Sequence, residues 1–400
     1  MKIIVIGCGK IGKTIIEHVS KEGHSLVIVD NNREKVEELI ERYDVMGVVG
    51  NGASLDIQEE AGVKSADLVI AVTPEDEINI LASMVAKKLG ASSTIARVRN
   101  PEYLRQTKLM QEELGLSMVV NPEQETADEI INMVNLPSLL KLEPFAKGKV
   151  NLVEILVEEN NPLIGETLIT MSKKIKTKVL ICAIQRASHV IIPNGNFKIE
   201  QGDRLSITAN ASSLVTFLKE LNLIKSPLKN IMIIGGGKIS YYLAKELSNK
   251  KYHIKLIEMN KNRAEEMAEA LPKVDVICGD GTDHDLLIEE GIEASDACIA
   301  LTNVDEENII VSMYATRLKI KKVIAKIKRN SFLTMVNDLG IASIVSPKDI
   351  VASKIISYIR ALSNKRGSNV LTLYKLVNNQ VEALEFDAKK KEKFYNKPLK

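Results

Sequence analysis

The sequence predicts an α/β protein with two doubly wound parallel sheets, one in each half of the chain. Short β-branched runs alternate with helical segments, the pattern occurs twice, and each copy opens on a strand that leads into a glycine-rich turn and a helix. Such alternation is typical of βαβ units on a parallel sheet. The 400 residues are enough for two to four domains at about 100–200 residues each.

The strands of the first half are predicted from five apolar runs. These runs are Ile3–Ile6, Leu26–Val29, Val45–Val49, Leu68–Val72 and Ile95–Val98. Segments with helical periodicity separate them, among them Arg33–Arg42 and Glu75–Leu89. In a doubly wound sheet the ligand binds outside the carboxyl ends of the strands, so this edge is where we expect a site.

The second half repeats the first at a nearly constant offset. Gly7 aligns with Gly235 and Asp30 with Glu258, each pair 228 residues apart. The triplet 50–52 (GNG) aligns with 279–281 (GDG), and the triplet 97–99 (RVR) with 326–328 (KIK), each pair 229 residues apart. An offset that stays this steady over about 120 residues indicates a tandem duplication.

Each copy leads into a smaller segment of different texture. Residues 149–224 alternate apolar and polar residues, contain turn signals at Asn160–Pro162 and Pro193–Asn196, and end on a predicted helix at Ser212–Leu221. We therefore expect parallel-sheet domains at 1–148 and 229–366 and small α+β domains at 149–224 and 367–400. The last of these should be incomplete, because the later strands and helix of the first copy have no counterpart before Lys400.

The composition narrows the classes of function. The chain has 54 Lys and Arg residues and 52 Asp and Glu residues, so its net charge is +2. This charge lacks the strong positive excess that is typical of nucleic-acid-binding proteins. No apolar run approaches the roughly 18 residues of a membrane span, and Met1 leads directly into a strand rather than a signal peptide. The four cysteines and five histidines lack ligand spacing, so we expect no metal site and a reducing, cytoplasmic environment.

The first glycine-rich turn carries the dinucleotide-binding pattern GxGxxG. Gly7, Gly9 and Gly12 follow the first strand directly, and Asp30 ends the next strand 23 residues after Gly7. In a Rossmann-type unit these glycines give a tight turn, close approach of the backbone to a pyrophosphate, and close helix packing. We expect Asp30 to accept hydrogen bonds from ribose hydroxyls and to disfavour the 2′-phosphate of NADP.

The same segment also matches the phosphate-loop pattern GxxxxGK[ST], as GCGKIGKT at residues 7–14. The second copy decides between the two patterns, because it keeps Gly235, Gly237 and the acidic Glu258 but has no GK[ST]. The shared positions are those of a dinucleotide site, so we favour the Rossmann interpretation. Ser240 replaces the third glycine, and we expect looser helix packing there and a second site that binds more weakly or takes another nucleotide.

Polar residues follow the strands at the same edge in both copies. They are Asn51 and Asp280 after the third strand, and Thr73 and Thr302 at the end of the fourth. We expect these four to contact the ligand, although turn formation at strand ends would also explain their residue types. Arg97 and Lys326 in the fifth strand either face a phosphate or are half-exposed strand residues.

The sequence does not offer the residues that hydride transfer needs. A dehydrogenase carries a proton donor and a substrate-anchoring Arg in a second domain. His189 is the only histidine of residues 149–224, and a surface strand position explains it better. Cys8 lies within the glycine turn, where small-residue filler is the better explanation. We therefore predict a protein that is not an enzyme, with an NAD-dependent dehydrogenase as the alternative.

Four segments resemble the TrkA family, the regulatory subunits of Trk-type potassium uptake, which consist of tandem potassium-transport nucleotide-binding or regulator-of-potassium-conductance (RCK) domains. The segments are GCGKIG with Asp30, GNGAS at 50–54, ADLVIAVTPEDEIN at 66–79 and ARVRNPEY at 96–103. The resemblance covers essentially the whole chain. It implies a cytoplasmic subunit that binds NAD or NADH, and also adenine nucleotides such as ATP and ADP. Such a subunit gates a separate membrane potassium-translocating subunit from the inner face of the membrane.

The resemblance also implies a homo-oligomer, a dimer or tetramer that forms a ring, and a set of nucleotide contacts. These are Gly7, Cys8, Gly9, Lys10, Ile11, Gly12, Asp30, Asn51, Thr73, Pro74 and Arg97, and in the second copy Gly235, Gly236, Gly237, Lys238, Ile239, Glu258, Asp280 and Thr302. Asn51 departs from the family, where an Asp is common. The segment Glu123–Leu140 carries an apolar stripe that includes Met133, Val134, Leu136, Leu139 and Leu140. Core packing explains the stripe as well as a subunit interface does, but we expect it to be an exposed face for self-association.

Overall fold

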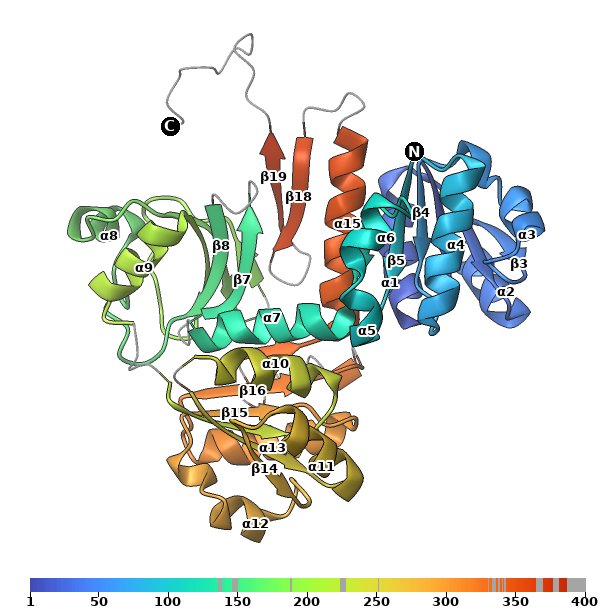
Figure 1. The fold of residues 1–400 in the computed structure, drawn as a ribbon. Helices are drawn as coiled ribbons and strands as arrows, with labels where there is room; N and C mark the ends of the chain where they lie inside the picture. Colours follow the sequence, from blue (N-terminus) through green and yellow to red (C-terminus); the bar gives the residue numbers. More distant parts are fainter. Residues whose placement is uncertain are drawn as a thin grey trace. The chain divides into compact units, whose positions relative to one another are not determined.

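The described residues form two six-stranded parallel sheets and two antiparallel sheets (Figure 1). The computed structural model describes all residues except 136–138, 146–149, 188, 224–227, 251, 330, 333–335, 337–338, 340, 342, 365–369, 377–380 and 387–400. The chain divides into two compact units, each described by itself below. Unit 1 combines Met1–Thr126 with Ser346–Ser368, and unit 2 combines Ala127–Val345 with Asn369–Lys400.

Unit 1 contains the first parallel sheet, in the order β3-β2-β1-β4-β5-β6. Its strands are β1 (Lys2–Ile6), β2 (Ser25–Asp30), β3 (Met46–Val49), β4 (Leu68–Ala71), β5 (Ser93–Arg97) and β6 (Met118–Val120). The intervening helices are α1 (Lys10–Val19), α2 (Arg33–Arg42), α3 (Leu55–Glu60), α4 (Asp76–Leu89), α5 (Pro101–Leu104) and α6 (Thr107–Glu112), with short 3₁₀ turns at Ser20–Glu22 and Val63–Ser65. The strand order reverses between β1 and β4, which is where a doubly wound sheet binds its ligand.

Both faces of this sheet are buried, which explains why its strands are continuously apolar. Ile3 and Val5 of β1 belong to one hydrophobic cluster, and Ile4 and Ile6 belong to another on the opposite face. Successive side chains of a strand point to opposite faces, so a run such as Ile3–Ile6 supplies both cores at once. The predicted α/β fold is confirmed.

The helix α15 (Pro347–Asn364) comes late in the sequence but packs against α1 in unit 1. Its buried Ile355 and Ile359 share a cluster with Ile15 and Ile16. An ion pair between Arg360 and Glu22 also connects this helix to the first sheet domain. The domain boundaries expected from the sequence stay a prediction, because the compact units follow packing rather than chain order.

Unit 2 contains a second parallel sheet with the same strand order, β14-β13-β12-β15-β16-β17. Its strands are β12 (Asn230–Ile234), β13 (His253–Glu258), β14 (Asp275–Cys278), β15 (Ala297–Ala300), β16 (Lys322–Lys326) and β17 (Ser343–Val345). The helices are α10 (Lys238–Ser248), α11 (Lys261–Ala270), α12 (His284–Glu289) and α13 (Asp305–Arg317), with a 3₁₀ turn at Ile292–Ala294. The duplication inferred from the sequence is therefore a duplication of fold.

The antiparallel sheets also belong to unit 2. The larger has the order β10-β9-β11-β8-β7, and the smaller pairs β18 with β19. The strands are β7 (Leu139–Phe145), β8 (Val150–Leu156), β9 (Leu180–Arg186), β10 (His189–Ile191), β11 (Arg204–Ala209), β18 (Val370–Leu376) and β19 (Val381–Phe386), and the helices are α8 (Leu168–Lys174) and α9 (Ala211–Glu220). The predicted helix Ser212–Leu221 corresponds to α9. The expectation that the last small domain is incomplete concerns residues that lie mostly outside the described ones.

The expectation that the apolar stripe of Glu123–Leu140 is exposed is wrong for those of its residues that the structure describes. The segment forms α7 (Pro122–Asn135) and then enters β7. Met133 and Val134 are buried, at 4% and 1% exposure. An apolar helix stripe has the same pattern whether it meets a core or a second subunit, and here it meets a core. Leu136 and the side chains of Leu139 and Leu140 lie outside the described part of the chain.

Candidate nucleotide-binding sites

The first glycine loop has the backbone that its pattern predicts. Gly7 has φ +103°, and a Cβ built there would lie 2.8 Å from the amide nitrogen of Thr73. A Cβ at Gly12 would lie 2.0 Å from the carbonyl oxygen of Gly7. Gly9, in contrast, has no atom within 4 Å of its Cβ position. Gly7 and Gly12 therefore serve the turn and the helix packing, and Gly9 leaves an open approach to the backbone.

The start of α1 offers amide groups to an anion. Gly9 is the N-cap of this helix and provides no side-chain cap. The first amides of a helix have no partner within it, and the helix dipole adds partial positive charge there. An open glycine beside uncapped helix amides fits a pyrophosphate group.

Asp30 is fixed beside this loop by two backbone amides. The amide of Cys8 donates to Oδ2 at 2.7 Å, and the amide of Asn32 donates to Oδ1 at 2.9 Å. The carboxylate is half-buried at the carboxyl end of β2. Each oxygen retains acceptor capacity for a ribose hydroxyl, since an ionised carboxylate has about four lone-pair sites.

The second loop repeats this arrangement with a longer acid. Gly235 has φ +98°, and Gly237 again has no atom within 4 Å of its Cβ position. The amide of Gly236 donates to Oε2 of Glu258 at 2.5 Å, and the amide of Asn260 donates to Oε1 at 2.8 Å. Both copies therefore hold an acidic side chain against the second residue of the glycine turn.

Ser240 occupies the place of the third glycine without leaving a gap. It is fully buried, and its hydroxyl donates a hydrogen bond of 2.5 Å to the carbonyl oxygen of Gly235. In the first copy the same carbonyl, that of Gly7, lies against Gly12 without a side chain between them. The helix at the second site is therefore joined to its loop by a side-chain hydrogen bond that Gly12 cannot make in the first.

Buried asparagines organise the neighbouring strand ends, a role that the sequence analysis missed. Asn79 accepts a 2.7 Å hydrogen bond from the amide of Thr73, and its Nδ2 donates to the carbonyl oxygens of Thr73 and Arg97. It thereby fixes the ends of β4 and β5 relative to each other. The equivalence of Asn79 and Asn308 in the repeat was the signal that could have revealed this role.

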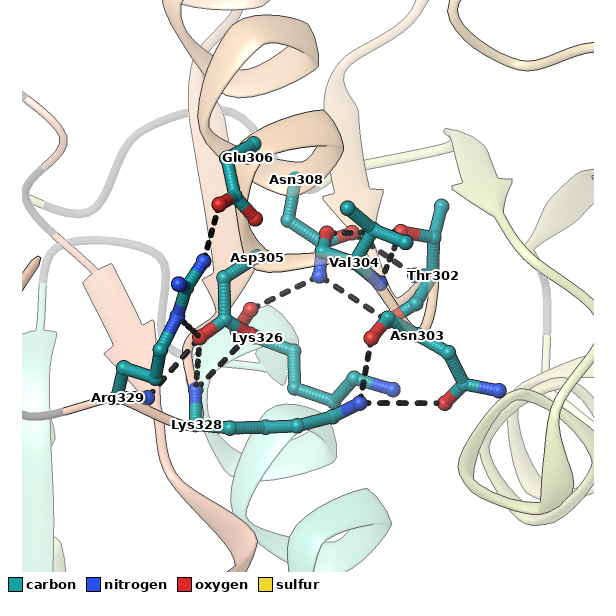
Figure 2. Close-up of polar contacts among 9 residues, drawn as sticks. All are labelled: Thr302, Asn303, Val304, Asp305, Glu306, Asn308, Lys326, Lys328 and Arg329. Atoms are coloured by element: carbon teal, nitrogen blue, oxygen red, sulfur yellow. Dashed lines mark hydrogen bonds and ion pairs between the residues drawn. The ribbon is translucent and has the colours of Figure 1, made fainter.

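The second copy shows the same network (Figure 2). Asn308 accepts from the amide of Thr302 at 2.8 Å and donates to the carbonyl oxygens of Thr302 and Lys326. The carboxylate of Asp305 accepts from the amides of Lys328 and Arg329. Asp76 accepts the equivalent amides of Arg99 and Asn100 in the first copy. The loop after each fifth strand is thus tied to the start of the helix that follows the fourth.

Arg97 and Lys326 bind strand-end carbonyl groups. Nη1 of Arg97 donates to the carbonyl oxygen of Thr73 at 2.8 Å, while its buried Nε has no partner among the described residues. Burial lowers the pKa of the Arg97 guanidinium. Lys326 is buried, at 5% exposure, and its Nζ donates to the carbonyl oxygen of Leu301 at 2.8 Å. One of the two alternatives expected a half-exposed residue at this position, and Lys326 is more buried than that.

Asn51 and Asp280 shape their own turns. Oδ1 of Asn51 accepts from the amide of Ala53 at 3.0 Å. Oδ1 of Asp280 accepts from the amide and the hydroxyl of Thr282, and these bonds lower the pKa of Asp280. Both residues are exposed, so turn formation and ligand contact are compatible.

The remaining predicted contacts lie around the loops. Lys10 and Ile11 begin α1, Lys238 and Ile239 begin α10, and Pro74 is exposed directly after Thr73. The phosphate-loop alternative requires Lys13 and Thr14 to face a phosphate, and both side chains have other partners. Lys13 pairs with Glu38 at 2.6 Å, and the hydroxyl of Thr14 donates to a helix carbonyl.

The described residues around the loops carry no evident reactive group. Cys8 is buried, and its thiol has a pKa raised to about 12. Burial is the largest cause, and the negative charge of Asp30 raises the pKa further. His189 is an exposed residue of β10, as predicted. Within the described ranges, no three His, Cys, Asp or Glu side chains are grouped so that they could hold a metal ion. No described helix is long and apolar enough to cross a bilayer.

The chain contains two Rossmann-type parallel sheets, each with its own glycine loop. It is therefore a protein with two nucleotide-binding folds in tandem. The TrkA-N domain model matches residues 3–122 and 231–347, and the TrkA-C domain model matches residues 152–222. The chain belongs to the TrkA family of Trk system potassium uptake proteins. The resemblance inferred from the sequence is thus confirmed.

Relatives of known name support this assignment. The Trk system potassium uptake protein TrkA of Vibrio alginolyticus is 34% identical over 391 residues, which is 96% of this chain and 83% of the relative. Homolog 1 from Methanosarcina mazei is 32% identical over 407 residues, with 100% and 98% coverage.

Solved structures share the fold at low sequence identity. The RCK domain of GsuK superimposes with a TM-score of 0.66 at 20% identity, covering 93% of this chain and 79% of that one. The GsuK channel gives a TM-score of 0.68 at 20% identity, and this chain, matched over 91% of its own length, spans 64% of that channel chain. Structures of GsuK bound to NAD and to ADP give TM-scores of 0.66 and 0.57, at 20% and 16% identity. The first covers 93% of this chain and 66% of that one, and the second 91% and 69%.

Proposed function

We propose that this chain is a nucleotide-responsive regulatory subunit that gates a separate membrane potassium-translocating subunit. The observation that carries the proposal is the repeated loop geometry. Gly9 and Gly237 are open to a ligand, each precedes an uncapped helix, and each lies near a carboxylate fixed by loop amides. The family relationship supports a role in potassium uptake.

The fit of a dinucleotide follows from the order of these groups along the sheet edge. The pyrophosphate would lie over Gly9 or Gly237 and the first helix amides, and the adenosine ribose would meet Asp30 or Glu258. The strand-end residues after β4 and β15, including Thr73, Pro74 and Thr302, would border the other half of the ligand. Shorter adenine nucleotides such as ADP and ATP would use the first two of these positions. GsuK structures bound to NAD and to ADP have a related fold.

Regulation requires that the nucleotide bind two states of the protein unequally. In unit 1, α1 begins at the glycine loop and packs along its length against α15. A nucleotide that shifts the start of α1 would therefore act on a helix that follows the second sheet domain in sequence. We propose that the chain acts as a homo-oligomer at the cytoplasmic face of the membrane, held there by its transporter partner.

We further propose that the chain is not an enzyme. The thiol of Cys8 stays protonated at neutral pH, and His189 is exposed on an antiparallel strand. A steady oxidation of NADH with common keto acids, abolished by Gly9→Asp, would contradict this part of the proposal.

Calorimetric titration of the full chain with NAD, NADH, ADP and ATP tests the nucleotide sites. Gly9→Asp and Gly237→Asp each place a charged side chain where the pyrophosphate should lie, in a space that is otherwise open. We expect two nucleotides per unmodified chain and one for each variant. Absence of binding by all four nucleotides would reject the proposal. Light scattering with and without nucleotide tests the oligomer, and a monomer in both conditions would contradict it.

A further inference from the structure

At the second candidate site a fixed arginine bonds the glycine loop, whereas its counterpart in the first copy is a lysine that makes no such bond among the described residues. Arg263 is the third residue of α11, and its Nε donates a 2.8 Å hydrogen bond to the carbonyl oxygen of Gly236. The amide of the same Gly236 donates to Glu258. The peptide groups around Gly236 are thus held by an acid through the amide and by a base through the carbonyl.

The guanidinium retains one nitrogen that donates to no acceptor among the described residues. Its Nη1 pairs with Glu266 at 2.8 Å, and Nη2 has no acceptor within the described part of the chain. The side chain of Arg263 is 35% exposed. Because Nε and Nη1 are both bonded, the planar group is held in one orientation beside the glycine loop, and its Nη2 amino group is available to a ligand.

The equivalent residue of the first copy is Lys35. Both residues stand five positions after the acidic residue, and both backbone amides donate to the N-cap asparagine of their helix, Asn32 or Asn260. Lys35 is exposed, and its ammonium makes no hydrogen bond or ion pair among the described residues. A lysine on a free four-carbon stem is a mobile point charge, whereas the arginine is already placed.

The position of Arg263 coincides with the part of a dinucleotide that separates NAD from NADP. In Rossmann-type sites an acidic residue at the end of the second strand contacts the ribose 2′-hydroxyl, and a nearby arginine accommodates a 2′-phosphate. Glu258 is that acid, and each of its oxygens accepts one backbone amide, as those of Asp30 do. The two sites therefore differ at Arg263 rather than in how the acid is held. The Nη2 amino group of Arg263 adds a charged hydrogen-bond donor for phosphate next to this acid.

We propose that Arg263 determines specificity and allows the second site to accept a dinucleotide with a 2′-phosphate, while the first site selects against it. This inference rests on the proposed nucleotide-binding function and names the ligand class of one of its two sites. The two sites of one chain would then report on two different nucleotide pools.

The test compares the sites one at a time in the full chain. Gly9→Asp leaves only the second site, and Gly237→Asp leaves only the first. Calorimetry with NAD and NADP gives the ratio of the two dissociation constants for each. We expect the preference for NAD over NADP to be at least tenfold smaller at the second site. Arg263→Ala, in the Gly9→Asp chain, should restore the preference by weakening NADP and sparing NAD.

Two further variants separate recognition from a purely structural role. Arg263→Lys keeps the charge but loses the fork, and it should give an intermediate ratio. Lys35→Ala, in the Gly237→Asp chain, is the matched control and should leave the ratio unchanged. Equal ratios at both sites, or an equal loss of NAD and NADP binding in Arg263→Ala, would overturn the inference and leave the proposed function intact. If the second site binds neither NAD nor NADP, the inference falls. The proposed function falls with it only if NADH, ADP and ATP also fail to bind the full chain.

Discussion

Glu258 lies so close to Gly236 that a side chain at that glycine would force it to shift. Its Oε2 is 2.5 Å from the amide nitrogen of Gly236, and a Cβ built on that glycine would lie 3.0 Å from Cγ of Glu258. In the first copy the shorter Asp30 makes the same bond, at 2.7 Å, to Cys8, which does carry a side chain. The length of the acid and the size of the loop residue therefore vary together between the two sites.

This relationship predicts that a larger residue at position 236 is tolerated only together with a shorter acid at position 258. Gly236→Cys alone should lower the free energy of unfolding of the second sheet domain by roughly 1–3 kcal/mol, because it forces Glu258 out of position. Glu258→Asp in the same chain should recover most of the loss. Thermal unfolding of the single and double variants measures the coupling, which shows as non-additivity. Strictly additive shifts in melting temperature would argue against a steric link.

Asp30 should control the nucleotide preference of the first site. Asp30→Ala removes a charge that faces the 2′ position of the ribose, so NAD should bind more weakly and NADP should lose less. We expect the preference for NAD to fall about tenfold, the equivalent of about 1.4 kcal/mol. Calorimetry in the Gly237→Asp chain measures this, with Glu258→Ala as the matched control that should not change the ratio. Tighter binding of NADP than of NAD before any substitution would contradict the assignment of Asp30.

The cysteines should differ strongly in reactivity at neutral pH. Burial raises the pKa of the thiols of Cys8 and Cys298 to about 12, and it raises that of Cys182 as well. Only the thiolate reacts with disulfide reagents, so these thiols should be slow at pH 8. Cys278 is exposed and should be labelled first. Mass spectrometry of a timed labelling reaction checks the order, and labelling of Cys8 as fast as Cys278 would show that the first loop opens.

Asp296 should make the stability of the second sheet domain depend on pH in the acid range. Burial raises the pKa of this carboxyl, but hydrogen bonds from Lys321 and from the amides of Asn230 and Lys229 outweigh it and lower the pKa from 3.8 to about 2. A carboxyl with a depressed pKa stabilises the folded state above its unfolded pKa, and this stability is lost as the pH falls through the folded value.

Asp296→Asn should therefore lower the melting temperature most above pH 4. The difference from the unmodified chain should shrink between pH 4 and pH 2, as the native carboxyl becomes protonated. Thermal scans across this range are the measurement. A difference that stays constant down to pH 2 would mean that Asp296 contributes by shape and not by charge.

Local pattern was sufficient to predict the elements and the glycine loops. The helix Arg33–Arg42 and the carboxyl end of β2 at Asp30 lie where the sequence indicates, because period and cap residues are local signals. Comparison of the two copies directed attention to the positions that they share. It therefore passed over Arg263, whose importance lies in its difference from Lys35.

Packing partners could not be predicted in the same way. The apolar face of α15 has helical periodicity, but nothing in that period says that it covers α1 of the first sheet. The prediction that Met133 and Val134 form an exposed stripe is wrong for the same reason. The role of Asn79 depends on carbonyl groups from two strands, and these become neighbours only when the sheet forms.

Potassium flux in reconstituted vesicles tests the regulatory account most directly. The cognate potassium-translocating subunit is placed in liposomes, and flux is measured with and without this protein, in NAD and in ADP. A difference of about 1.4 kcal/mol between the affinities of a nucleotide for two states shifts their ratio tenfold. We predict that the protein changes the flux, that the change differs between nucleotides, and that the double variant Gly9→Asp/Gly237→Asp abolishes the nucleotide dependence. Flux that is the same with and without the protein, in every nucleotide, would contradict the account.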